Sequence, residues 1–178
     1  VLEGQLVRSE IVVVSGAAGG EATTRIRQVM AELGEIEVNR VAMPPGSVQG
    51  FGRLGRDEIP TFLLPSNPVS ALVVFEIMVR PLIRIALGKR QPMRRSVRAR
   101  TVAPISSVEG RRGYLRGQLM RDTDTGEYLV RALGGAQGAS THLLASLAEA
   151  NCLVMIDPEI SAVRAGDEVD VMFLAQRG

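Results

Sequence analysis

Two short segments hold residue types that could bind an anionic group. The first, Leu64–Ala71, reads L-P-S-N-P-V-S-A and joins an apolar run to an apolar helix. Asn67 is a good helix cap and Pro68 suits the first helical position, so the free N–H groups of a helix N-terminus are expected here. Together with the Asn67 and Ser70 side chains, these N–H groups would stabilise a phosphate or another oxyanion. The alternative is a plain cap, in which Asn67 satisfies only its own helix.

The second segment is the glycine-rich turn Ser15–Gly20 (S-G-A-A-G-G), which ends the β-branched run Ile11–Ser15. Small residues between a strand and a helix let a phosphate approach the backbone closely. The turn matches neither G-x-G-x-x-G nor the P-loop pattern, so an ordinary tight turn is the alternative. Both segments would lie at the carboxyl ends of strands in one sheet, where open α/β sheets bind ligands.

Composition excludes several other kinds of chemistry. The chain has 178 residues and a net charge of +2, too small a basic excess to indicate nucleic-acid binding. The basic run Lys89–Arg100 lacks aromatic residues and is interpreted as a linker or strand. Cys152 is the only cysteine, which fits a cytoplasmic protein without disulfides, and His142 is the only histidine available to a catalytic triad. Charged residues interrupt the apolar stretch Val69–Leu87, so no membrane span is expected.

Hydrophobic periodicity predicts the elements that position the two segments. In the first part, strands and helices are expected over residues 11–15, 26–33, 35–43, 59–64 and 68–87. Pro81 should kink or restart the last helix. This order predicts an α/β layer with a mostly parallel sheet in residues 1–90. Residues 91–178 contain a hairpin at 114–133 and strands over 152–156 and 168–174, and they predict a small all-β, barrel-like domain.

The segment Phe62–Ala71, followed by Phe75-Glu76 and Val79-Arg80-Pro81, resembles a known family signature. The signature is G-L-P-G-N-P-V-S-A…F-E…V-R-P of the molybdopterin molybdenumtransferases, the family of MoeA and the E domain of gephyrin. Leu115-Arg116-Gly117 and Leu147–Asn151 extend the similarity over essentially the whole chain. The resemblance implies part of a MogA-like molybdopterin-binding α/β domain, followed by the C-terminal β domain. It also implies a homodimer that uses molybdate and Mg²⁺ to convert adenylylated molybdopterin into the molybdenum-loaded cofactor, with release of AMP.

Carried over position by position, the resemblance implies substrate binding by eight residues and assigns neither a catalytic residue nor a metal ligand. The eight are Ser15, Gly16, Pro65, Asn67, Pro68, Ser70, Arg116 and Ser140. The family's paired aspartates correspond to Ala22 and Thr24, and its two turn lysines to Pro44 and Ser47. Aspartates hold magnesium and lysines neutralise oxyanions. A second interpretation therefore stays open: a paralogue that binds molybdopterin, or a protein partner at the β domain, without turnover.

Overall fold

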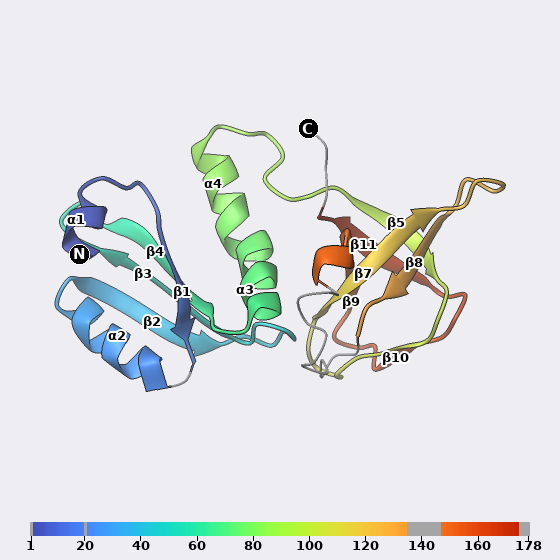
Figure 1. Ribbon diagram of the computed structural model, residues 1–178, viewed down its shortest axis with the longest axis horizontal. Coiled ribbons are helices and arrows are strands. Elements are labelled where there is room, and N and C mark those ends of the chain that lie inside the picture. The colour runs from blue at the N-terminus through green and yellow to red at the C-terminus, as the bar shows by residue number, and fades with distance from the viewer. Residues whose placement is uncertain (1, 20, 135–146, 175–178) are drawn as a thin grey trace. The chain divides into compact units, whose positions relative to one another are not determined.

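The computed structural model describes residues 2–19, 21–134 and 147–174, without the side chains of Glu21 and Ala22. Ser140 and His142 lie outside the described residues. The chain forms two compact units: unit 1 is Val1–Val41 with Gly46–Pro92, and unit 2 is Ala42–Pro45 with Met93–Gly178. Unit 1 combines helices and strands, whereas strands dominate unit 2 (Figure 1). No helix in the described part of the chain is long and apolar enough to cross a membrane.

A four-stranded sheet in the order β1-β4-β3-β2 forms the middle of unit 1. Its strands are β1 (Val12–Ala18), β2 (Gly34–Arg40), β3 (Val48–Leu54) and β4 (Ile59–Pro65). Strand β1 is parallel to β4, but β3 is antiparallel to both β4 and β2. The sheet is therefore mixed, and the expectation of a mostly parallel sheet is wrong. The difference comes from β3, which was not predicted because its glycines weaken the strand pattern of the sequence. Short connections join β3 to β2 and to β4, and such connections form antiparallel hairpins.

Helices cover β4 from both faces of the sheet. Successive side chains of a strand point to opposite faces, so β4 contributes to two separate cores. Leu63 packs with Met30 of α2 (Glu21–Ala31) and with α1 (Leu2–Leu6), whereas Phe62 and Leu64 pack with the helix that follows β4. Unit 1 is thus a three-layer α/β/α structure, which confirms the predicted α/β fold class.

The long helix predicted after β4 is present as three consecutive parts. These are α3 (Pro68–Val74), the π-helical turn η1 (Phe75–Val79) and α4 (Arg80–Ala86). Pro81 has no N–H, and its ring opposes the carbonyl four residues earlier. The chain accommodates the ring with a wider turn, in which the Arg80 N–H donates to the carbonyl of Phe75, five residues back. The predicted kink at Pro81 therefore takes the form of a π-turn.

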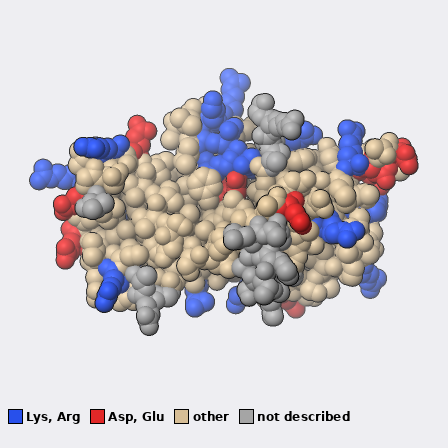
Figure 2. All heavy atoms as spheres, viewed as in Figure 1, with Lys and Arg blue, Asp and Glu red and all other residues tan. Residues whose placement is uncertain are grey.

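Two arginines hold the segment after α4 against that helix. Arg80 Nη1 donates to the carbonyl of Pro92 at 3.1 Å, and Arg84 Nε donates to the carbonyl of Gln91 at 3.0 Å. The Arg80 guanidinium also lies 3.7 Å from the buried carboxylate of Glu76. Lys and Arg side chains gather over α4 and the segment after it on the face shown in Figure 2. Arg80 and Arg84, which belong to this basic surface, therefore make contacts within the chain.

Unit 2 contains a closed barrel in the strand order β11-β5-β8-β7-β9. Its strands are β5 (Ser96–Thr101), β7 (Gly113–Arg121), β8 (Tyr128–Ala132), β9 (Cys152–Ile156) and β11 (Glu168–Phe173). A two-stranded sheet of β6 (Ile105–Ser106) and β10 (Ala162–Val163) accompanies the barrel. The predicted barrel-like unit and its β7–β8 hairpin are confirmed.

The turn of this hairpin is closed by Asp122. Its carboxylate accepts the N–H groups of Asp124 and Thr125 at 2.9 and 2.8 Å. These hydrogen bonds, led by that of Thr125, hold the pKa of the Asp122 carboxyl below its ordinary value. Turn chemistry thus explains the acidic residues of this turn.

The basic run predicted as a linker or strand includes β5, on the surface of the barrel. Arg98 of β5 lies 3.4 Å from Glu168 and 3.7 Å from Asp170, and Arg100 lies 3.6 Å from Glu127. The arginines of this strand therefore face acidic partners on neighbouring segments. This pairing favours a solvated barrel strand over an interface for polyanions.

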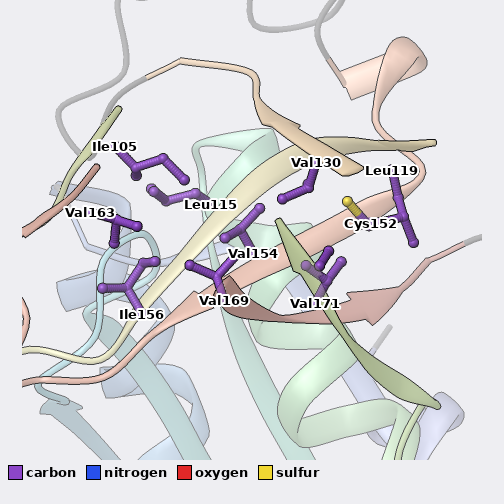
Figure 3. Packing of buried hydrophobic residues seen from close by; sticks show 11 residues of the cluster. Ile105, Leu115, Leu119, Val130, Cys152, Val154, Ile156, Val163, Val169 and Val171 are labelled. Atoms are coloured by element: carbon purple, nitrogen blue, oxygen red, sulfur yellow. The ribbon is translucent and has the colours of Figure 1, made fainter. Parts of the chain in front are cut away.

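Figure 3 shows the apolar side chains that fill the barrel, with Leu115 and Leu119 of β7 and Cys152 and Val154 of β9 among them. Gly117 lies between the two β7 leucines. A Cβ at Gly117 would come within 2.9 Å of both Cys152 Sγ and a Val154 methyl group. The glycine of the L-R-G segment therefore permits close packing of β7 on β9.

Burial of Cys152 predicts that stability falls at alkaline pH. The thiol is fully buried, and burial raises its pKa from about 9 to about 12. Well below pH 9 the thiol is protonated in both the folded and unfolded chains, so its contribution is constant. Between about pH 9 and 12 only the unfolded chain ionises, so the free energy of unfolding should fall by up to about 1.4 kcal/mol per pH unit.

Denaturant titrations of the wild type and Cys152→Ala between pH 8 and 11 measure this effect. The wild type should lose stability with pH faster than the variant. Iodoacetamide at pH 8.5 should modify Cys152 only after unfolding, because the folded thiol is inaccessible and protonated. Parallel pH curves for the two proteins, together with rapid labelling of the native state, would contradict the expected burial.

Candidate functional site

The parallel pairing of β1 with β4 brings the two candidate segments to one edge of the sheet. Ala18, the last residue of β1, is in register with Pro65, the last residue of β4. The chain after Ala18 leads into α2, and the chain after Pro65 leads into α3. Two helix N-termini therefore begin at the carboxyl end of one strand pair, the position where α/β sheets bind ligands.

Ser15 and Gly16 lie in an irregular part of β1 rather than in a turn after it. Val14 pairs with Leu63, and Ala18 pairs with Pro65. Between these two pairs β1 advances by four residues, whereas β4 advances by only two. Gly16 has a φ of +77°, which favours glycine, and no atom lies within 4 Å of the position a Cβ would occupy. The prediction that the strand ends at Ser15 is therefore corrected to a bulged strand that continues to Ala18. Bulges of this kind are common beside functional sites.

Asn67 caps α3, as the sequence predicts. Its Oδ1 accepts the N–H groups of Val69 and Ser70 at 3.0 and 3.1 Å, and Pro68 occupies the first turn. Ser66, Asn67 and Pro68 are exposed, Ser70 is half-buried and Pro65 is buried. The capping interpretation is thus correct for Oδ1. The exposed loop still presents neutral polar side chains at the sheet edge.

Arg116 lies in unit 2, on the face of β7 that points away from the barrel core. It pairs with Leu153 of β9 and is only 7% exposed. A Cβ on Gly134 would lie 3.4 Å from Arg116 Nη2, so the guanidinium packs against a glycine two residues after the end of β8. Burial lowers the pKa of the Arg116 guanidinium, which remains charged near neutral pH because arginine titrates far above it. A buried, charged guanidinium is suited to holding an oxyanion.

The segment Ala42–Pro45 belongs to unit 2, although β2 and β3 on either side of it belong to unit 1. The carbonyls of Ala42 and Pro44 accept the N–H groups of Arg112 and Tyr114 at 3.0 and 2.9 Å. The segment therefore lies along the start of β7, the strand that carries Arg116. Sequence reasoning identified this turn by resemblance but gave no sign of its pairing partner.

Thr23, in the first turn of α2, is a buried residue that sequence reasoning missed. It is 8% exposed, and its hydroxyl has no hydrogen-bond partner among the described residues. Its position was visible in the pattern, since Ile26 and Met30 follow three and seven residues later on the same helix face.

Among the side chains that the structure describes, those at the sheet edge offer neutral donors and acceptors rather than carboxylates. Ser15, Ser66, Asn67 and Ser70 supply hydroxyl and amide groups, and the helix N-termini supply N–H groups. Among the described residues, no group of three His, Cys, Asp or Glu side chains could hold a metal ion. This donor set does not fit Mg²⁺, which prefers carboxylate oxygens. It does fit an uncharged polar ring system or an oxyanion.

The fold is that of a two-part protein, an α/β domain whose sheet edge carries polar side chains, followed by a β-barrel. Comparison with known families agrees with this class. Residues 1–85 match the model of a probable molybdopterin binding domain, and residues 98–174 match the MoeA C-terminal region (domain IV). The two matches together span most of the chain, which belongs to the MoeA family.

Relatives and solved structures support the assignment over the whole chain. The chain is 69% identical over 178 residues to molybdopterin molybdenumtransferase 1 of Mycobacterium tuberculosis, and 33% identical over 177 residues to molybdopterin molybdenumtransferase 2 of that organism. It covers 42% of each of these proteins and so spans about two-fifths of their length. The crystal structure of the molybdopterin biosynthesis MoeA protein from Pyrococcus horikoshii matches 98% of the chain, and 40% of that protein, with a TM-score of 0.76 at 29% identity.

A prediction at Asn67 separates its capping of α3 from ligand binding by the loop. Asn67→Asp keeps an oxygen that caps α3, so stability should stay within about 0.5 kcal/mol of the wild type, whereas Asn67→Ala should lose about 1 kcal/mol. The added negative charge of Asn67→Asp should instead weaken binding of an anionic ligand about tenfold. Thermal denaturation and molybdopterin binding are the two measurements. Equal ligand affinity in Asn67→Asp and the wild type would show that the ligand does not bind at this loop.

Proposed function

We propose that this chain forms the molybdopterin-binding edge and the C-terminal barrel of a molybdopterin molybdenumtransferase. The reaction inserts molybdate into adenylylated molybdopterin and releases AMP. The chain's own part is to bind and orient the pterin substrate with Ser15, Gly16 and the Pro65–Ser70 loop, and to hold an oxyanion with Arg116. Ser140 is proposed as a further substrate contact on resemblance alone.

The observation that carries the proposal is the register of Ala18 with Pro65 at the ends of β1 and β4. It joins two segments, far apart in sequence, that the resemblance separately assigns to substrate. Membership of the MoeA family, with relatives named molybdopterin molybdenumtransferase, supports the same substrate. A bulged strand with open space at Gly16 and an exposed Ser66–Pro68 loop would admit a ligand between the two segments.

Several parts of the proposal rest on the family resemblance rather than on the residues of this chain. A homodimer and a cytoplasmic location are proposed from the family resemblance. Mg²⁺ is expected for the family reaction, yet the described residues supply no fitting ligand set. Residues of the chain are therefore assigned to binding and orientation only, and no step is assigned to the metal.

Genetic complementation tests the function directly. The full-length gene would be expressed in a strain lacking its molybdenum insertase, and nitrate reductase activity would be assayed at low molybdate. Restored activity is the expected result. A well-expressed, folded protein that fails to restore activity at low or high molybdate would overturn the insertase proposal.

One sequence observation favours a second candidate, a molybdopterin-binding or protein-binding scaffold without turnover. Ala22 and Thr24 stand where the family has aspartates, and Pro44 and Ser47 stand where it has lysines. A scaffold of this kind would bind molybdopterin with normal affinity but fail in complementation. Binding and complementation measured on the same preparation therefore separate the two candidates.

A further inference from the structure

A groove of about 540 Å³ opens in unit 1 where three segments meet. These are the end of α1, the residues that follow α2, and the turn between β3 and β4. The Gly55 N–H of that turn donates to the carbonyl of Leu33 at 2.8 Å, and a Cβ on Gly55 would lie 3.5 Å from the Leu6 side chain. Backbone and packing contacts therefore hold the turn against the other two segments and fix the shape of the groove.

Aliphatic side chains line part of this groove. They are Leu6, Val7, Leu33 and Ile59. Leu6 is buried, whereas Val7 is 83% exposed. A single exposed valine is ordinary on a protein surface, but this one adjoins further apolar side chains in a concave site. Covering it with an apolar side chain of a partner would remove that surface from water, which is favourable.

The charged residues of the groove are mainly acidic. Glu3, Glu32 and Asp57 bring three carboxylates and Arg56 brings one guanidinium, a net charge of −2 in a chain whose net charge is +2. All four side chains are exposed, and none of them forms an ion pair with another described residue. The groove therefore carries the sign opposite to that of the whole chain, and its carboxylates are available to a partner.

The end of α2 adds to the negative potential of the groove. The last carbonyls of a helix carry a partial negative charge, which Lys or Arg in the last turn often compensates. The last turn of this 11-residue helix has no basic residue, and Glu32 follows directly. Since neighbouring like charges repel, a cationic group in the groove would be favourable. The same sign excludes polyanions, such as nucleic acid or an anionic lipid surface, as occupants.

We propose that this groove is a docking surface for a basic, amphipathic segment of a partner protein, in which Lys or Arg side chains flank an aliphatic side chain. The aliphatic side chain of the segment covers Val7 and Leu33, and its cationic side chains pair with Glu32 and Asp57. Apolar burial supplies affinity at the centre, and the charges around it select the partner and orient it.

The groove and the candidate site lie at opposite ends of β4. The groove includes Ile59, the first residue of β4, whereas Pro65 at the candidate site is the last. A strand rises about 3.3 Å per residue, so about 20 Å separates the two ends. A partner bound in the groove therefore leaves the sheet edge of the candidate site open to its ligand.

The test uses the full-length protein and three peptide probes: acetyl-RRLLRR-amide, acetyl-RRSSRR-amide and acetyl-EELLEE-amide. Calorimetry measures their affinities, and NMR spectra of the Val7, Leu33 and Ile59 methyl groups locate the bound peptide. At low salt the first probe should bind with a dissociation constant on the order of 100 μM, the second about tenfold more weakly, and the third not at all. High salt should weaken binding of the first probe, because exposed charges are screened.

Two double variants test the charges. Glu32→Gln with Asp57→Asn removes two carboxylates of the groove and should weaken binding of acetyl-RRLLRR-amide about tenfold. Glu109→Gln with Glu159→Gln makes the same change in net charge at two exposed residues of unit 2, and should bind this probe like the wild type. All four side chains are exposed, so both variants should remain folded.

Several results would overturn the proposal. They are no binding of acetyl-RRLLRR-amide by the full-length protein, equal affinity for acetyl-RRSSRR-amide, equal affinity in the two double variants, and methyl shifts confined to residues outside the groove. Sedimentation of the wild type covers a further occupant. If the protein self-associates and the Glu32→Gln, Asp57→Asn variant does not, the groove holds a second copy of this chain and the proposed partner protein is wrong.

Discussion

Arg116→Ala is expected to lower molybdenum insertion about 100-fold while leaving molybdopterin binding at the sheet edge of unit 1 nearly unchanged. Removing one charged donor from an oxyanion site costs on the order of 3 kcal/mol of transition-state stabilisation. Arg116 is suited to this role because the residue is 7% exposed and is therefore largely screened from bulk water. The loss should be greatest at low molybdate and should diminish as the molybdate concentration rises, if the oxyanion held is molybdate.

Three further variants separate function from folding. Arg116→Lys keeps the charge but loses the planar donor pair, so it should recover part of the activity. Arg116→Met preserves much of the buried side-chain volume and should remain folded while being inactive. Arg131→Ala removes an exposed arginine from neighbouring β8 and should be fully active. If a folded Arg116→Met protein inserts molybdenum at the wild-type rate at low molybdate, Arg116 is not part of the site.

The candidate site was predictable where its signals are local. The Asn67 cap depends on residues within one helical turn, and the α3 N-terminus forms where the sequence places it. Both ends of the strand Cys152–Ile156 were predicted correctly, because a short unbroken apolar run between polar residues is typical of a buried strand. The β7–β8 hairpin followed from the turn residues between its strands.

Features that depend on distant pairing were not predictable from local patterns. At the bulge of Ser15 and Gly16, β1 has more residues than β4 between two successive pairs of the ladder. No local sequence pattern encodes that difference. The pairing of Ala42–Pro45 with the start of β7 joins residues about 70 positions apart. Strand β3 was missed because Gly50 and Gly52 weaken its pattern, although both glycines are required by the packing of the sheet.

Gly52→Ala should therefore be among the most destabilising single-methyl substitutions in unit 1. Gly52 pairs with Ile36 of β2 on one side and with Thr61 of β4 on the other. A Cβ at Gly52 would collide with the carbonyl oxygen of Glu35 and would lie 2.7 Å from the Cα of Ile36. Both contacts are with backbone, so no change of rotamer relieves them and β2 must separate from β3. The expected cost is about 3 kcal/mol or more in the free energy of unfolding.

Hydrogen exchange read by mass spectrometry localises this effect. Peptides from Gly34–Leu54 should exchange faster in Gly52→Ala than in the wild type, whereas peptides from β7 in the barrel should change far less. Gly4→Ala is the matched control: Gly4 lies in α1 with nothing within 4 Å of its Cβ position, so alanine there should be neutral or slightly stabilising. If Gly52→Ala unfolds within about 0.5 kcal/mol of Gly4→Ala, β2 and β3 do not pair as closely as this structure places them.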